Sequence, residues 1–139
     1  MTGIDYNDLN PESVPYFMDQ IPAGASTKTI LHFAQLMING GEFLKWDYGT
    51  EMNLQIYGSE TPPKYDLTQV KVPTTMYAGD ADSLIGLADV RALSKVLPND
   101  RMHVIDKEDW GHFDFIFSDQ RGELVYEDIL FNLKRLDDD

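Results

Sequence analysis

The stretch VPTTMYAGDAD, residues 72–82, decides the fold class that we expect for this chain. Its first seven residues are mostly β-branched or apolar, which is typical of a buried strand, and Pro73 stands near the start, where a backbone donor can be spared. The last four residues form a turn that contains two aspartates. We therefore expect a strand over residues 72–78 that delivers a carboxylate into the loop after it.

A helix, a second strand and a last helix follow this stretch. The helix is expected over residues 88–97, since Pro98 ends it. The apolar run at 102–105 predicts the second strand, and a long amphipathic segment predicts a helix over about 122–136. The positions expected to lie on the apolar faces are Val90, Leu93 and Leu97 of the first helix and Val125, Ile129, Leu133 and Leu136 of the second. This order of elements predicts an α/β fold with a parallel pair of strands joined by a crossover helix.

The part of the chain before residue 70 has one clear element. Its apolar residues recur at helical spacing, which predicts an amphipathic helix that starts after Ser26 or Thr27 and ends before Gly40. The residues of that stripe are Ile30, Phe33, Ala34, Met37 and Ile38. Residues 43–63 show no sustained period and are interpreted as a long covering loop, with short strands at most.

Two parallel strands do not form an independently stable sheet, because parallel strands need cover on both faces. We therefore expect this chain to be the C-terminal piece of a larger α/β domain.

The composition limits the classes of function. The chain has 139 residues, 42% of them hydrophobic, which suffices for a folded core. Its formal charge of −13 argues against nucleic acid and against anionic membranes as partners. With no cysteine, disulfides and thiolate metal sites are excluded. We find no signal peptide and no apolar run long enough to span a membrane.

Asp82 and His112 are the candidate catalytic pair. Each follows a predicted strand, and the carboxyl ends of parallel strands meet at one edge of a sheet, where active sites form. An aspartate there can orient the imidazole and stabilise its protonated form. The order acid, then histidine, matches that of α/β-hydrolases. Two alternatives remain open: Asp82 caps the next helix while His112 packs under Trp110, or Asp80 takes the acid role.

Other chemistry is not supported. The pair Asp80 and Asp82 lacks the remaining ligand positions of a calcium loop. His32 and His103 are expected to be structural or surface residues, and no spacing fits a zinc site, so we expect no metal and no cofactor. No serine lies in a G-x-S-x-G motif, and the nearest candidate, Ser26, is expected to be a helix cap. Without a nucleophile, the chain alone is expected to be inactive.

From about Pro22 to Leu133, the sequence resembles the C-terminal part of the acid lipases, the gastric and lysosomal type with its insect relatives. The motifs that carry the resemblance are Pro22-Ala23-Gly24-x-Ser26, His32-Phe33-x-Gln35, Trp46-Asp47-Tyr48-Gly49, Pro62-Pro63-x-Tyr65-Asp66-Leu67-Thr68, Val72-Pro73, Gly79-x-x-Asp82 and His112-x-Asp114-Phe115-Ile116. Their order and spacing along the chain are specific to the family.

The resemblance implies the C-terminal part of an α/β-hydrolase fold. Asp82 would be the acid and His112 the base of a Ser-His-Asp triad, and the spacing Gly-x-x-Asp favours Asp82 over Asp80. Residues 1–63 would be a cap-derived segment with one amphipathic helix, and residues 64–139 the C-terminal βαβα part of the core.

The resemblance also implies a function. The family hydrolyses triacylglycerols and cholesteryl esters, needs no metal, and is secreted or lysosomal. The expected partners are a neutral lipid ester, peripheral contact with a lipid interface and the missing N-terminal part of the hydrolase domain. Met1 is accordingly expected to be the start of a fragment, a truncated gene model or an expression product. The alternative function is a non-catalytic, lipase-like module that binds a lipid or a protein partner.

Overall fold

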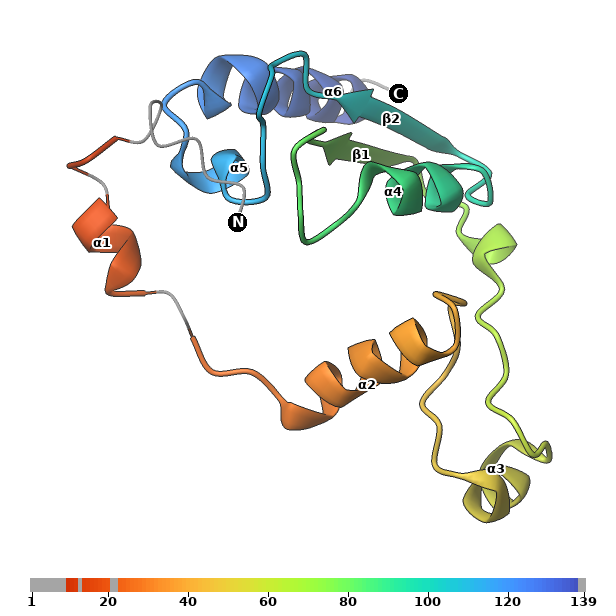
Figure 1. Ribbon diagram of the computed structural model, residues 1–139. Coiled ribbons are helices and arrows are strands. Elements are labelled where there is room, and N and C mark those ends of the chain that lie inside the picture. The colour runs from red at the N-terminus through yellow and green to blue at the C-terminus, as the bar shows by residue number, and fades with distance from the viewer. Residues whose placement is uncertain (1–9, 13, 21–22, 138–139) are drawn as a thin grey trace. The chain divides into compact units, whose positions relative to one another are not determined.

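The computed structural model describes residues 10–12, 14–20 and 23–137. For residues 136 and 137 it describes the backbone only. The chain forms two compact units. The first contains Met1–Ile21 and Val70–Asp139, and the second contains Pro22–Gln69. Figure 1 labels the helices and strands of both units.

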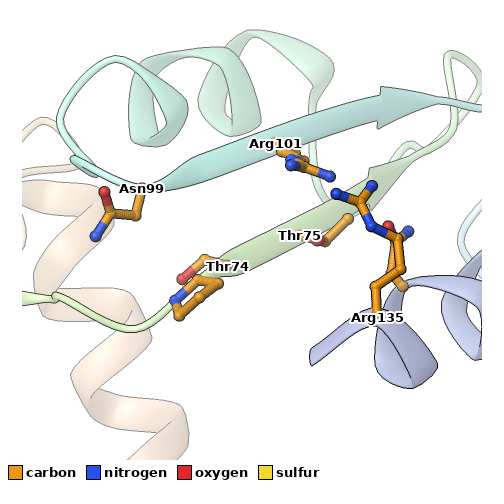
Figure 2. A pocket seen from close by; sticks show the side chains of 7 residues that line it. Thr74, Thr75, Asn99, Arg101 and Arg135 are labelled. Carbon is orange, nitrogen blue, oxygen red and sulfur yellow. The ribbon is translucent and has the colours of Figure 1, made fainter. Parts of the chain in front are cut away.

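The first unit is built on two parallel strands. β1 (Thr74–Ala78) pairs with β2 (Asp100–Val104), with Thr74 opposite Asp100 and Ala78 opposite Val104. Helix α4 (Leu87–Ser94) connects them and lies on one side of the pair, whereas α6 (Glu127–Asp137) lies on the other (Figures 1 and 2). The predicted α/β class with a parallel pair is confirmed.

The core of the first unit lies between the strands and the segment that leads into α6. Trp110 is fully buried, and Ile105 and Val125 pack with it. The partly buried side chains around these three are Tyr77, Phe115, Leu124 and Ile129. The site loops therefore rest directly on the apolar core.

The inward face predicted for the last helix is only partly correct. Val125 is buried and Ile129 packs on the core, but Leu133 is 54% exposed. Two steps of four residues turn a side chain by about 80° around an α-helix, so that Leu133 leaves the face of Val125. A π-helical turn, Gly122–Tyr126, precedes α6 and alters the phase further. The side chain of Leu136 lies outside the described residues.

Two short helices complete the first unit. α5 (Asp114–Phe117) follows the His112 loop, and α1 (Val14–Met18) comes from the N-terminal part of the chain. The ring of Phe17 in α1 meets that of Phe117 in α5 edge to face, at 4.9 Å between centroids. This contact links the N-terminal segment to the segment after the candidate site.

The second unit contains the predicted amphipathic helix. α2 (Thr27–Ile38) begins directly after Ser26, as expected, although the Ser26 side chain makes no capping hydrogen bond. Its apolar stripe is exposed, with 64% of Phe33 and 84% of Ile38 accessible to solvent. Amphipathicity alone predicted the helix but not a surface that covers it.

The loop expected over residues 43–63 contains a helix, α3 (Thr50–Tyr57), so that prediction was wrong in part. The helix has no apolar stripe, and its only buried residue is Asn53. In place of the short strands that the sequence allowed, the described residues of this segment form one antiparallel bridge, between Leu44 and Lys64. A 3₁₀ turn, Leu67–Gln69, ends the unit.

Polar side chains hold α2 and α3 to the chain between them. The Asn53 side chain accepts a hydrogen bond from the Tyr48 N–H and donates to the Asp47 carboxylate and the Glu60 carbonyl. The Gln35 amide donates to the Asp47 carbonyl at 2.8 Å and accepts from the Asp47 N–H at 3.1 Å. These bonds, and not an extended apolar core, define the shape of the second unit.

Candidate active site

The loops that follow β1 and β2 are joined by backbone hydrogen bonds. The Ile105 N–H donates to the Ala78 carbonyl at 2.9 Å and extends the ladder beyond β2. The Ala81 N–H then donates to the Trp110 carbonyl at 3.2 Å. The loop that carries Asp82 and the loop that carries His112 are therefore held beside each other.

Gly79 permits this close approach. A Cβ atom at this position would lie 2.1 Å from the Trp110 carbonyl oxygen and 2.8 Å from the edge of the Trp110 ring. Carbon and oxygen cannot approach so closely, so any side chain would push the two loops apart. The glycine of the Gly-x-x-Asp motif is thus required because the loop after β2 lies directly against it.

Two buried residues, Trp110 and Asp114, hold the His112 loop in place. The Trp110 ring packs edge to face on Phe115 at 5.6 Å between centroids. The Asp114 carboxylate, 1% exposed, accepts a hydrogen bond from the Gly111 N–H at 2.6 Å. Sequence reasoning did not find this role of Asp114, although a carboxylate inside the apolar run His112 to Ile116 was a signal for it.

His112 and Asp82 form a direct pair. The His112 Nδ1 lies 2.9 Å from the Asp82 Oδ2. The Asp82 side chain is 8% exposed, and that of His112 is 34% exposed. Among the described residues, nothing forms a hydrogen bond with the His112 Nε2. The imidazole is therefore oriented by a largely buried carboxylate on one nitrogen and open on the other.

The second Asp82 oxygen, Oδ1, accepts hydrogen bonds from the Leu84 N–H at 2.9 Å and the Ile85 N–H at 2.8 Å. Partial burial by itself raises the pKa of Asp82. The hydrogen bonds from the Ile85 N–H, the His112 ring and the Leu84 N–H together outweigh burial and hold the pKa below its ordinary value. Asp82 is thus kept as a carboxylate, the form that can stabilise an imidazolium.

The geometry distinguishes between the two alternatives for this pair. α4 begins at Leu87 after Gly86, so Asp82 closes the turn before the helix and does not cap the helix itself. Asp80 is exposed, and the bond to His112 comes from Asp82. Of the two aspartates, Asp82 is the one that pairs with His112.

The other histidines lie elsewhere. His32, in the second unit, has its Nε2 3.0 Å from the Leu44 carbonyl oxygen, and His103 stacks on Tyr77 at 5.3 Å between ring centroids. Within residues 10–12, 14–20 and 23–137, no three acidic or histidine side chains are grouped so that they could hold a metal ion. None of the helices in these residues combines the length and the apolar character that a membrane-spanning helix needs.

Comparison with known proteins identifies the family. No family model matches the chain. Lipase 3 of Drosophila melanogaster is 37% identical over 129 residues, which is 92% of this chain and 32% of that protein. Lipase member N of Homo sapiens is 33% identical over 135 residues, 95% of this chain and 33% of that protein. Triacylglycerol lipase 1 of Arabidopsis thaliana is 33% identical over 124 residues, 88% of this chain and 31% of that protein.

The chain belongs to the acid lipase family. It spans about one third of the length of the curated lipases that it matches. The resemblance found in the sequence motifs is therefore confirmed at the level of the family.

Proposed function

We propose that this chain supplies the acid and the base of a Ser-His-Asp triad in a carboxylic-ester hydrolase, within the C-terminal part of an α/β-hydrolase domain. The observation that carries the proposal is the 2.9 Å contact between His112 Nδ1 and Asp82 Oδ2, with the opposite ring nitrogen open. Family membership supports it independently, since the relatives are named lipases.

The proposed mechanism assigns one task to each side chain. His112 takes the proton of a serine hydroxyl through Nε2 and later returns it to the leaving alcohol. Asp82 accepts the hydrogen bond from Nδ1–H, which fixes the tautomer and stabilises the imidazolium. This sequence holds no G-x-S-x-G motif, so the serine would come from residues outside it.

The substrate and setting are proposed from the family. We infer a neutral lipid ester, triacylglycerol or cholesteryl ester, as substrate; one relative is named a triacylglycerol lipase. Residues 1–63 would belong to the cap over the lipid site and residues 64–139 to the hydrolase core. The remaining part of the hydrolase domain would be the protein partner, and the whole enzyme would be secreted or lysosomal.

A chimera tests the proposal. The third of Drosophila lipase 3 that matches this chain is replaced by this chain, and turnover of a p-nitrophenyl ester is measured. We expect activity in the chimera and a loss of about 10³-fold or more on Asp82→Asn or His112→Ala. Asp80→Asn is the matched control and should retain activity. An active chimera that tolerates His112→Ala would overturn the assignment.

A second measurement needs no chimera. The free chain should hydrolyse no p-nitrophenyl ester, and ¹⁵N-NMR of its imidazoles should show His112 with the proton on Nδ1. Asp82→Asn should change this tautomer balance, whereas Asp80→Asn should leave it as it is. A His112 proton that resides on Nε2 in the unaltered chain would contradict the proposed base.

A non-catalytic module that binds lipid or protein is the second candidate function. The observation that favours it is the exposed apolar stripe of α2, in which 79% of Met37 is accessible. A partner-binding module has no use for a buried carboxylate paired with an open imidazole. Binding of a lipid or a protein by this chain, together with a chimera whose activity does not change on His112→Ala, would favour the module.

A further inference from the structure

A pocket of about 170 Å³ lies at the opposite end of the strands from Asp82 and His112. Its lining includes residues at the start of β1 and β2. The residues that line it are Pro73, Thr74, Thr75, Asn99, Arg101, Asn132 and Arg135. Figure 2 shows Arg101 extending from β2 and Arg135 from α6 toward the same space above β1.

The two arginines place two positive charges in one pocket of an acidic chain, which has 24 acidic residues against 11 lysines and arginines. Within the described part of the chain, neither the Arg101 nor the Arg135 guanidinium forms an ion pair or a hydrogen bond. Two like charges that share a pocket repel each other. An anion placed between them would be attracted to both, and these two attractions would offset the repulsion.

Two carboxylates among the described residues near the pocket interact with other side chains. The Asp128 carboxylate on α6 accepts hydrogen bonds from the Tyr77 hydroxyl at 2.6 Å and the Asn132 amide at 3.0 Å. The Asp100 carboxylate accepts from the Ser94 hydroxyl. The C-terminal end of α6 attracts Arg135 with about half a charge at most, which does not neutralise two full charges.

We propose that this pocket binds a phosphate group. Each guanidinium presents parallel N–H donors that match two phosphate oxygens, and Thr75 adds a hydroxyl at the wall. The ligand is an inorganic phosphate or a soluble phosphate monoester in preference to a phospholipid headgroup, because a chain of charge −13 is repelled by anionic vesicles. The site does not depend on the proposed hydrolase function.

Titration of the full chain with inorganic phosphate, by calorimetry at constant ionic strength in chloride, tests the site. We expect saturable binding that weakens about tenfold on Arg101→Gln or on Arg135→Gln, since each removes one charged fork. Arg91→Gln is the matched control, because Arg91 is an exposed arginine on α4 outside the pocket. Circular dichroism checks that each variant is folded.

Two results would overturn the proposal. One is equal phosphate binding by all three variants, and the other is no saturable binding by the unaltered chain. Arg101→Lys keeps the charge and loses the fork, and should give an intermediate affinity. Sedimentation with vesicles that contain phosphatidic acid identifies the source of the phosphate: co-sedimentation that requires Arg101 and Arg135 indicates a headgroup, and its absence with intact phosphate binding indicates a soluble ligand.

Discussion

At the scale of single residues, the carboxylate of Asp82 links the geometry of the site to the stability of its loops. It receives three hydrogen bonds, from the His112 ring and from the Leu84 and Ile85 N–H groups. Its pKa is lowered from the ordinary value of 3.8. A carboxyl with a lowered folded pKa stabilises the fold above its unfolded pKa, and that contribution disappears as the pH falls through the folded value.

We predict that Asp82→Asn lowers the free energy of unfolding by about 1–3 kcal/mol at pH 7, because an amide replaces a charged acceptor of three hydrogen bonds. The difference from the unaltered chain should shrink as the pH falls below 3.8, where the carboxyl of the unaltered chain becomes protonated. Urea unfolding at several pH values measures this. Asp80→Asn is the control, and a difference that does not vary with pH would refute the linkage.

At the scale of elements, local pattern predicted what local interactions form. β1, α4 and β2 overlap the ranges predicted for them, because strand composition and helical spacing are contained within each segment, but α4 ends at Ser94, before the end predicted from Pro98, and β2 begins at Asp100 instead of Met102. α3 was missed since its buried face is one amide, Asn53, whose partners lie five to seven residues away on either side. The pairing of Asp82 with His112 followed from the strand spacing. The need for glycine at position 79 could not be predicted, because it arises from a carbonyl 31 residues later.

Asn53 also gives a prediction for the second unit. Asn53→Asp replaces the donor to the Asp47 carboxylate by a second carboxylate in a site that is 1% exposed. Two carboxylates there repel, and the Glu60 carbonyl loses its donor as well, so we expect a loss of about 2–4 kcal/mol at pH 7. Low pH should restore part of the loss, since a protonated carboxyl can donate again.

Hydrogen exchange of the amides in residues 50–57 measures this change. Asn53 also contributes to the lowered pKa of Asp47, as its side-chain hydrogen bond is the largest cause of that shift, so the Asp47 pKa should rise in the variant. Asn39→Asp, at an exposed position after α2, is the control. Equal protection of α3 in the variant and the unaltered chain would show that the network is not what holds the helix.

At the scale of the whole molecule, exposed apolar surface is the dominant feature. The large exposed side chains of α2 and α6 are Ile30, Leu31, Phe33, Met37 and Ile38, and Leu130, Phe131 and Leu133. Monomeric proteins rarely expose such faces, because removing apolar surface from water lowers the free energy. Both units therefore offer surfaces for a partner, another copy or the rest of a hydrolase domain.

We predict concentration-dependent association of the isolated chain, measured by light scattering. Phe33→Glu should shift the population toward the monomer, because it places a charge on the exposed stripe of α2. Thr61→Glu adds the same charge at an exposed polar position of the same unit and serves as the control. A compact monomer at all concentrations, in the unaltered chain, would contradict this reading of the surface.

The burial of Trp110 has a spectroscopic consequence. The chain has two tryptophans, and they fall in different units: Trp110 is fully enclosed beneath the His112 loop, whereas Trp46 is partly exposed under the Lys28 ammonium, 4.8 Å from its ring centroid. An indole in an apolar enclosure emits at shorter wavelength than one in contact with water. The emission spectrum therefore carries a separate band position for each unit, and Trp46→Phe leaves a fluorophore whose red shift reports the opening of the loop pair that holds Asp82 and His112.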